Sequence, residues 1–187
     1  AVNYHFGDKM QLYVSVLQAA IDSVRAVIEA SMRPAEGLPP EEQLRRFITI
    51  FLRRLLTPGP NTVHQLMHRE MHDPTPALDA IVDQGVRPRI EYLSGVIAQM
   101  TGGDPGDDVV LRCVASIQSQ ALSYLHKPIA SRLTRFGSKL QPTVEEVWEL
   151  ARHITAFSIA GVHAVTRAAE DARGRSQASR RRRQRAS

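Results

Sequence analysis

Apolar residues recur at spacings of three and four along almost the whole chain, which is the period of an amphipathic helix. No segment shows the strict alternation of apolar and polar residues that is typical of a β-strand. Clusters of proline and glycine divide the pattern. The expected helices cover residues 8–32, 40–56, 61–72, 77–101, 107–126 and 143–172, with a short helical piece near 129–136. Gly85 and Pro88 predict a kink in the fourth of these helices. The sequence therefore predicts an all-α fold.

Two of the helices begin with clear start signals. Pro40 suits the first position of a helix, and the acidic residues that follow it interact favourably with the helix dipole. Thr143 is followed by Glu145 and Glu146, which is typical of a capped helix N-terminus. These signals predict where the second helix and the last long helix begin.

Composition limits the kinds of protein that this chain can be. With 43% apolar residues, the 187-residue chain can build a substantial core. Its apolar runs are too short to span a membrane, and the single cysteine, Cys113, excludes an internal disulfide framework. No Ser-His-Asp order, carboxylate pair, phosphate loop or metal cluster stands out. We therefore expect a cytoplasmic protein that is not an enzyme and holds no cofactor and no metal.

The net charge of +5 arises from one end of the chain. Residues 173–187 contain seven arginines and no acidic residue. The other 172 residues carry 17 basic and 19 acidic residues, a net charge of −2. We expect residues 173–187 to form a disordered tail, because like charges repel and little apolar surface is present to bury. Such a tail is either a solvated segment without a function or a source of sequence-independent phosphate contacts.

The first dozen residues have the pattern of a helix end, a turn and the start of a new helix. Gly7 allows the backbone to leave a helix, and Asp8 is a favourable N-cap for the next one. The chain starts with alanine and without the features of a signal peptide, so we expect that it begins inside a larger fold. Aromatic and basic residues flank the turn: Tyr4, His5, Phe6 and Lys9.

This opening resembles the TetR family of bacterial transcriptional regulators, whose helix-turn-helix domain closes with a Tyr-(Tyr/His)-Phe cluster, a turn and a lysine. The resemblance implies that Tyr4, His5 and Lys9 contact DNA phosphates. Residues 1–7 are then the end of the DNA-binding domain, the rest of which is missing, and residues 8–172 are the effector-binding and dimerisation domain. An ordinary helix–glycine–helix corner is the alternative.

A second segment, residues 69–79, is similar to the CecR-like subgroup of that family. It reads Arg-Glu-Met-His-Asp-Pro-Thr-Pro-Ala-Leu-Asp. The subgroup has a similar Arg-Glu-Met and Pro-Thr-Pro-Ala-Leu junction between two helices of its C-terminal domain. A looser similarity extends over residues 60–170.

The last helix carries two adjoining apolar stripes, whereas an ordinary surface helix carries one. The fifth helix is similarly broad. Helices of this kind need cover on two sides, and the same pair from a second subunit would complete a four-helix dimer interface. Two central helices of a monomer are the alternative. The residues expected at the dimer interface are Val110, Val114, Ile117, Ala121, Leu150, Ile154, Phe157, Gly161 and Ala164.

Two charged residues fall within apolar stripes. Glu70 lies in the stripe of the third helix, and Arg89 lies in that of the fourth. A buried charge is costly unless it is paired. We therefore expect these residues to pair with each other or with a polar group of a ligand, and a purely structural pair remains open.

A pocket for a small apolar or aromatic effector is expected between these helices, beside Pro88. The candidate residues are Phe51, Met67, Glu70, Met71, Arg89, Tyr92 and Met100. A methionine stripe is also compatible with simple core packing. The spacing of His64, His68 and His72 is that of a helical metal site, but on a helical wheel the three drift away from the apolar stripe. We expect a solvated flank there.

Two functions are compatible with these features. The first, which the resemblance implies, is a homodimeric DNA-binding repressor that a small-molecule effector releases from its double-stranded operator. The second is a helical dimeric scaffold that binds acidic partners through its arginine-rich end. Neither function involves a membrane.

Overall fold

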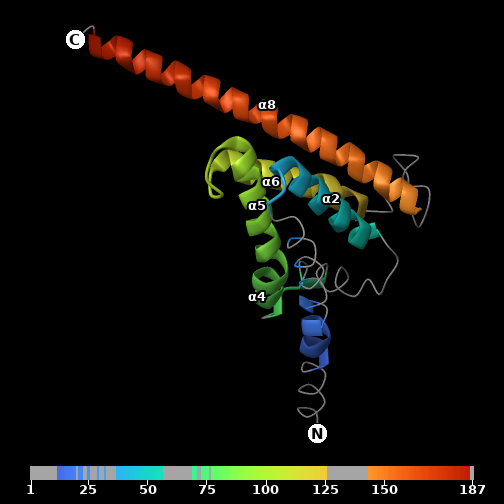
Figure 1. Ribbon diagram of the computed structural model, residues 1–187. Helices are drawn as coiled ribbons and strands as arrows, with labels where there is room; N and C mark the ends of the chain where they lie inside the picture. The colour runs from blue at the N-terminus through green and yellow to red at the C-terminus, as the bar shows by residue number, and fades with distance from the viewer. Residues whose placement is uncertain are drawn as a thin grey trace. The chain divides into compact units, whose positions relative to one another are not determined.

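The computed structural model describes residues 12–19, 21, 22, 25, 29, 32, 37–56, 69, 70, 73–75, 77–125 and 143–185. Every regular element in these ranges is a helix (Figure 1), which confirms the all-α prediction. The expected DNA contacts Tyr4, His5 and Lys9 lie outside the described residues, as do the three spaced histidines and the helical piece near 129–136.

The chain separates into two compact units. The first combines Ala1–Gly37 with Thr57–Tyr92, and the second combines Leu38–Leu56 with Leu93–Ser187. Each unit combines segments that are distant in sequence, and helix α5 (Arg87–Thr101) contributes residues to both. The expected effector-binding and dimerisation domain of residues 8–172 stays a prediction.

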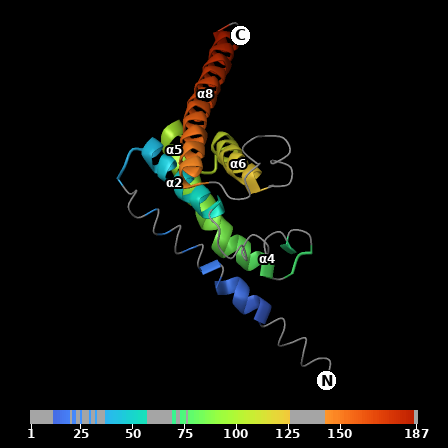
Figure 2. The ribbon, with the colours of Figure 1, turned by 90° about the vertical axis from the view of Figure 1, so that its right-hand side faces the viewer.

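The second unit is built around one long helix, α8 (Val144–Arg185). Helices α2 (Pro40–Leu56) and α6 (Asp108–Leu122) pack against the N-terminal half of α8 (Figure 1, Figure 2). A 3-10 turn, η3 (Ser123–Leu125), follows α6. Buried side chains from each helix form the core, among them Leu44, Ile48, Leu52, Ile97, Val110, Val114, Ile117, Ala151 and Ile154.

Specific contacts join α2 to α8 at both ends of their interface. The guanidinium carbon of Arg53 lies 6.0 Å from the centroid of the Trp148 ring. The His163 Nε2 atom lies 3.6 Å from a carboxylate oxygen of Glu41. These contacts join partly exposed side chains of the two helices, outside the buried core.

Helix α8 begins where the sequence predicts, with a reciprocal capping box. The backbone N–H of Glu146 donates to the Thr143 hydroxyl at 3.2 Å, and the backbone N–H of Thr143 donates to the Glu146 carboxylate at 2.7 Å. The helix continues to Arg185, so the expected end near residue 172 and the expected disordered tail are corrected over residues 173–185. Alanine, glutamine and arginine are good helix formers, and one glycine, Gly174, does not stop a helix by itself.

In the first unit, the helical residues 12–19 pack against two short consecutive helices. These are α4 (Ala77–Ala80) and a π-helix, η2 (Ile81–Val86). Leu17, Ile21 and Ile81 form its buried cluster. The Gln18 amide nitrogen also donates a hydrogen bond of 3.0 Å to the Gln84 side-chain oxygen. The first helical segment is thus held to η2 by both apolar and polar contacts.

The irregularity expected near Gly85 and Pro88 takes the form of this π-helix. The backbone N–H of Arg87 donates to the carbonyl of Val82, five residues earlier. Pro88 has no N–H for the Gln84 carbonyl and its ring would clash with that carbonyl in an α-helix. The wider π turn accommodates both effects.

Two buried threonines of the second unit provide a matched test of core polarity. The Thr49 hydroxyl donates to the Arg45 carbonyl at 2.8 Å, whereas the Thr155 hydroxyl has no hydrogen-bond partner among the described residues. We expect Thr155→Val to raise the free energy of unfolding by about 1 kcal/mol, because it removes an unsatisfied buried group. Thr49→Val is expected to lower it by about 1 kcal/mol. Urea unfolding measures both, and equal shifts in the same direction would contradict this assignment.

Candidate functional site

The side chain of Glu70 is fully buried, with a relative exposure of 0%. The Tyr13 hydroxyl donates a hydrogen bond to its Oε1 atom. The backbone N–H and the hydroxyl of Thr75 donate to its Oε2 atom at 2.8 and 2.9 Å. Both carboxylate oxygens therefore have partners, as a buried carboxylate requires.

The local chain geometry explains why Thr75 provides two of these donors. Residues 69 and 70 are helical, and the backbone N–H of Asp73 donates to the Arg69 carbonyl at 2.9 Å. Pro74 follows, and the Thr75 carbonyl accepts from the backbone N–H of Leu78 at 3.0 Å as α4 begins. Thr75 thus lies at the start of the next helix with its own N–H directed to Glu70.

The hydrogen bond from Tyr13 links the first helical segment to the junction of residues 69–75, although Tyr13 and Glu70 are 57 residues apart in sequence. Its half-buried ring also lies under Arg69, whose guanidinium carbon is 4.9 Å from the ring centroid. A cation over a tyrosine ring is a favourable contact. We call Tyr13, Arg69, Glu70 and Thr75 the Glu70 cluster.

Ionisation in the cluster follows from burial and hydrogen bonding. Burial raises the pKa of the Glu70 carboxyl, but the bonds from Tyr13 and Thr75 and the charge of Arg69 outweigh it, so the pKa is lower than usual. Burial, the bond to Glu70 and the charge of Glu70 raise the pKa of the Tyr13 hydroxyl. Because the Glu70 pKa is lowered on folding, its contribution to stability is present above the ordinary carboxyl range and is lost as pH falls through the lowered pKa.

Glu70 and Arg89 are expected from the sequence to pair with each other or with a polar group of a ligand. The described hydrogen bonds of the Glu70 carboxylate come from Tyr13 and Thr75. Sequence reasoning identified a buried carboxylate but missed its partners, because a tyrosine 57 residues away carries no signal in a helical wheel. Arg89 itself is half-buried on α5, and burial lowers the pKa of its guanidinium to about 10.

The other expected pocket residues are distributed over both units. Tyr92 is half-buried at the end of the first unit. Phe51 and Met100 belong to the second unit, where the Phe51 ring stacks on Phe47 with centroids 5.8 Å apart. Met67 and Met71 lie outside the described residues. The seven-residue pocket therefore stays a prediction.

The residues expected at a dimer interface divide into two groups. Phe157 is 63% exposed, Ala164 is also exposed, and Gly161 is half-buried. The other six are covered by the chain's own core and offer no surface to a second copy: Val110, Val114, Ile117, Ala121, Leu150 and Ile154. Adjoining stripes look alike in sequence, so periodicity alone did not separate the inward stripe from the outward one.

An exposed stripe remains on α8 in the second unit. It consists of Phe157, Ala160, Gly161 and Ala164, which we call the α8 stripe. A Cβ atom built on Gly161 would meet no heavy atom within 4 Å, so the backbone is open on that side. A large exposed aromatic residue beside small residues is the composition of a surface that another helix can approach closely.

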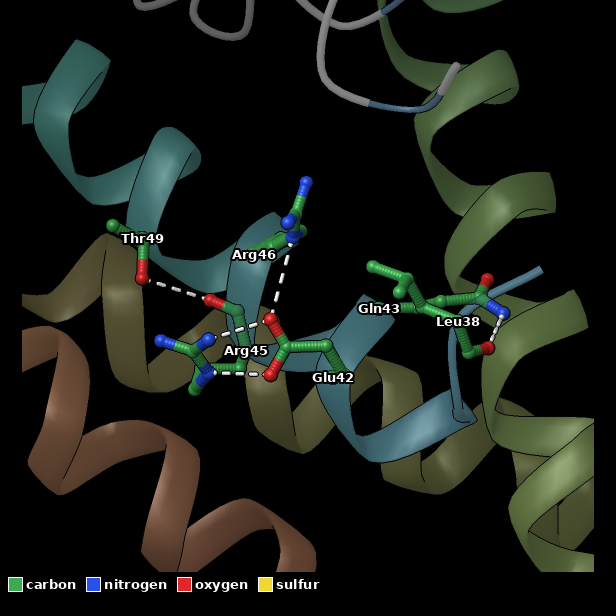
Figure 3. A network of polar contacts seen from close by, with 6 residues as sticks. All are labelled: Leu38, Glu42, Gln43, Arg45, Arg46 and Thr49. Atoms are coloured by element: carbon green, nitrogen blue, oxygen red, sulfur yellow. Dashed lines mark hydrogen bonds and ion pairs between the residues drawn. The ribbon is translucent and has the colours of Figure 1, made fainter. Parts of the chain in front are cut away.

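A second polar cluster lies at the start of α2 (Figure 3). Arg45 donates two hydrogen bonds to the Glu42 carboxylate, at 2.7 and 2.5 Å, and the Arg46 Nε atom lies 3.3 Å from it. The bond from Arg45 is the main cause of a lowered pKa of Glu42. The Gln43 amide donates to the Leu38 carbonyl at 2.8 Å. The contacts of Glu42 with Arg45 and Arg46 have the three- and four-residue spacing that stabilises a helix, and we assign the whole cluster to the start of α2.

Neither metal binding nor thiol chemistry is favoured in the described part of the chain. No three His, Cys, Asp or Glu residues there are grouped as metal ligands. Cys113 is buried, and burial raises the pKa of its thiol, which disfavours the reactive thiolate.

None of the described helices is both long enough and apolar enough to cross a membrane.

Comparison with known protein families identifies the family of the central part of the chain. Residues 40–162 match the family described as the HTH-type transcriptional dual regulator CecR, C-terminal domain. The matched range is more than half of the chain and includes Glu70, Thr75 and α2 through the packed half of α8. Comparison with curated proteins gives no match.

The Tyr13–Glu70 bond is expected to stabilise the folded chain. Tyr13→Phe removes the donor to a buried carboxylate and should lower the free energy of unfolding by about 1.5–3 kcal/mol. Tyr124→Phe is the matched control, because the half-buried Tyr124 makes no described hydrogen bond, and it should change stability by about 0.5 kcal/mol or less. Chemical unfolding of both variants provides the comparison. Equal effects of the two substitutions would show that the bond contributes nothing.

Proposed function

Because the chain belongs to the CecR-type C-terminal domain family of TetR-type transcriptional regulators, we propose that it is the effector-sensing and dimerising part of a DNA-binding repressor. The family is one of regulators and not of enzymes. The observation that supports the sensing role is the Glu70 cluster, which ties the first helical segment to the junction before α4.

The proposed mechanism is thermodynamic linkage. A ligand that prefers the DNA-incompetent arrangement lowers operator affinity by the ratio of its affinities for the two arrangements. The first helical segment acts as the lever, since Tyr13 contacts Glu70 and Gln18 contacts Gln84 of η2. A shift of η2 or of the Arg69–Thr75 junction would then move the segment that leads to residues 1–7. In this proposal, Tyr4, His5 and Lys9 contact DNA phosphates.

The proposed effector is a small apolar or aromatic molecule, in keeping with the pocket candidates in the first unit. Glu70 is engaged by Tyr13 and Thr75, so its role is to hold the junction. Arg89 is the proposed contact for a polar or anionic group of the effector, because it is a half-buried cation that lies about one helical turn from Tyr92 on α5. Tyr92 is proposed to line the same site.

The proposed dimer uses the α8 stripe. Two copies related by a two-fold axis present the same stripe to each other, and small residues permit close approach of the backbones. Burial of Phe157 would supply the main apolar contact. A dimer of this kind would hold two DNA-reading heads at a fixed spacing, as a symmetric operator requires. A regulator of bacterial transcription would act in the cytoplasm, where the DNA lies.

Selection of DNA from a pool of random duplexes tests the proposed function. The protein used must include the complete helix-turn-helix domain. We expect enrichment of a sequence with two-fold symmetry, protected over both half-sites in a footprint. Failure to enrich any motif with a folded, dimeric protein would contradict the repressor and favour the alternative of a scaffold for acidic partners.

A charged substitution on the α8 stripe tests the dimer. Phe157→Asp should raise the dimer dissociation constant at least tenfold, because it places a carboxylate in an apolar interface. Ala156→Asp is the matched control: Ala156 is exposed on the same helix and about 100° around its axis from Phe157. Sedimentation velocity at micromolar concentration measures the association state. Dimers of unchanged strength in Phe157→Asp, or monomers in the unsubstituted protein, would contradict the proposed interface.

A further inference from the structure

The C-terminal part of α8 leaves the core of the second unit. Val162 is the last buried residue of the helix among those whose burial is described, and the side chains described after it are exposed or half-buried. The helix nevertheless continues to Arg185 (Figure 1). At 1.5 Å per residue, the part beyond Val162 is roughly 35 Å long. A structured rod therefore extends beyond the packed bundle of α2, α6 and α8.

The end of this rod has an extreme composition. Residues 173–187 contain seven arginines, no acidic residue and two alanines as their only apolar residues. The run Arg180–Arg183 covers about one full helical turn, so these four positions are distributed around the helix axis. No apolar stripe is available with which this segment could join a protein core.

This composition restricts what the segment can bind. A helix that inserts into a membrane surface needs a large apolar face, which residues 173–185 lack. Repulsion among the arginines destabilises the helix itself, and a dense line of negative charge would relieve that repulsion. Duplex DNA presents one negative charge per about 1.7 Å of its axis, a density comparable with that of the arginine-rich helix.

We propose that residues 173–185 of α8 are a helical arm that binds the phosphate backbone of duplex DNA without regard to sequence. This inference rests on the proposed function, because a DNA-binding regulator brings such an arm close to DNA. The arm adds affinity and salt dependence, while sequence discrimination remains with the helix-turn-helix domain. The positive charge of the arm offsets the repulsion between DNA and the other 172 residues, whose net charge is −2.

The salt dependence of binding tests the arm. The chain of residues 1–187 is titrated with a fluorescent duplex of arbitrary sequence between 50 and 300 mM salt. In the test variant, arginines 180–183 and 185 are all replaced by glutamine. If four to five phosphate contacts are lost, the slope of log K against log salt should become shallower by about 4, with at least tenfold weaker binding at the lowest salt. An unchanged slope and affinity would overturn the proposal.

A charge-preserving variant separates binding from folding. Replacement of the same five arginines by lysine should retain most of the slope, because lysine also neutralises phosphates. Circular dichroism and sedimentation verify that both variants stay helical and keep the same association state. Loss of binding in the lysine variant equal to that in the glutamine variant would contradict a backbone-charge mechanism.

The random-pool selection distinguishes this inference from the proposed function. A shallower slope together with no motif in that selection would support the arm and contradict the repressor.

A competition experiment tests whether the partner of the arm is DNA or an acidic polypeptide. Polyglutamate at equal charge concentration serves as the competitor. If it displaces the duplex at the same concentration as unlabelled duplex does, the assignment to DNA falls and an acidic polypeptide partner is favoured.

Discussion

A buried carboxylate must receive hydrogen bonds, and in this chain that requirement organises the first unit. Glu70 is fully buried, and its three donors come from two segments that are distant in sequence. An unpaired buried carboxylate would cost several kcal/mol, so the positions of Tyr13 and Thr75 are coupled through one side chain. The first helical segment and the start of α4 are therefore held as a set. This coupling is the physical basis for treating the first helical segment as a lever.

Different parts of helix α8 differ in burial and in charge. Its N-terminal half supplies the core that α2 and α6 cover, and one side of that half carries the exposed stripe around Phe157. Beyond Val162 the helix has no described buried residue, and from residue 173 onward it is strongly basic. The packed core residues, the exposed α8 stripe and the arginine-rich segment thus lie on separate faces or in successive parts of one helix. In the proposed regulator, the same element would join dimer formation to contact with the DNA backbone.

Sequence reasoning succeeded where the signals are local. The bounds of α2 follow from Pro40 at its start and the Thr-Pro-Gly-Pro break after Leu56, and α8 begins at the capping threonine as expected. It also placed a conformational irregularity at Pro88, although a π-helix was not foreseen. It failed where the outcome depends on distant residues. The partners of Glu70 and the inward and outward stripes of α8 both arise from packing between segments far apart in sequence.

Amide hydrogen exchange of the Tyr13→Phe variant tests most directly whether Glu70 holds the two segments. The account predicts faster exchange in residues 12–19, because their polar attachment to the junction is lost. The Thr75 amide, which donates separately to Glu70 Oε2, should stay protected, and residues 147–162 of α8 should exchange at wild-type rates. Unchanged exchange in residues 12–19, or equal acceleration throughout the chain, would contradict the central role of the Glu70 cluster.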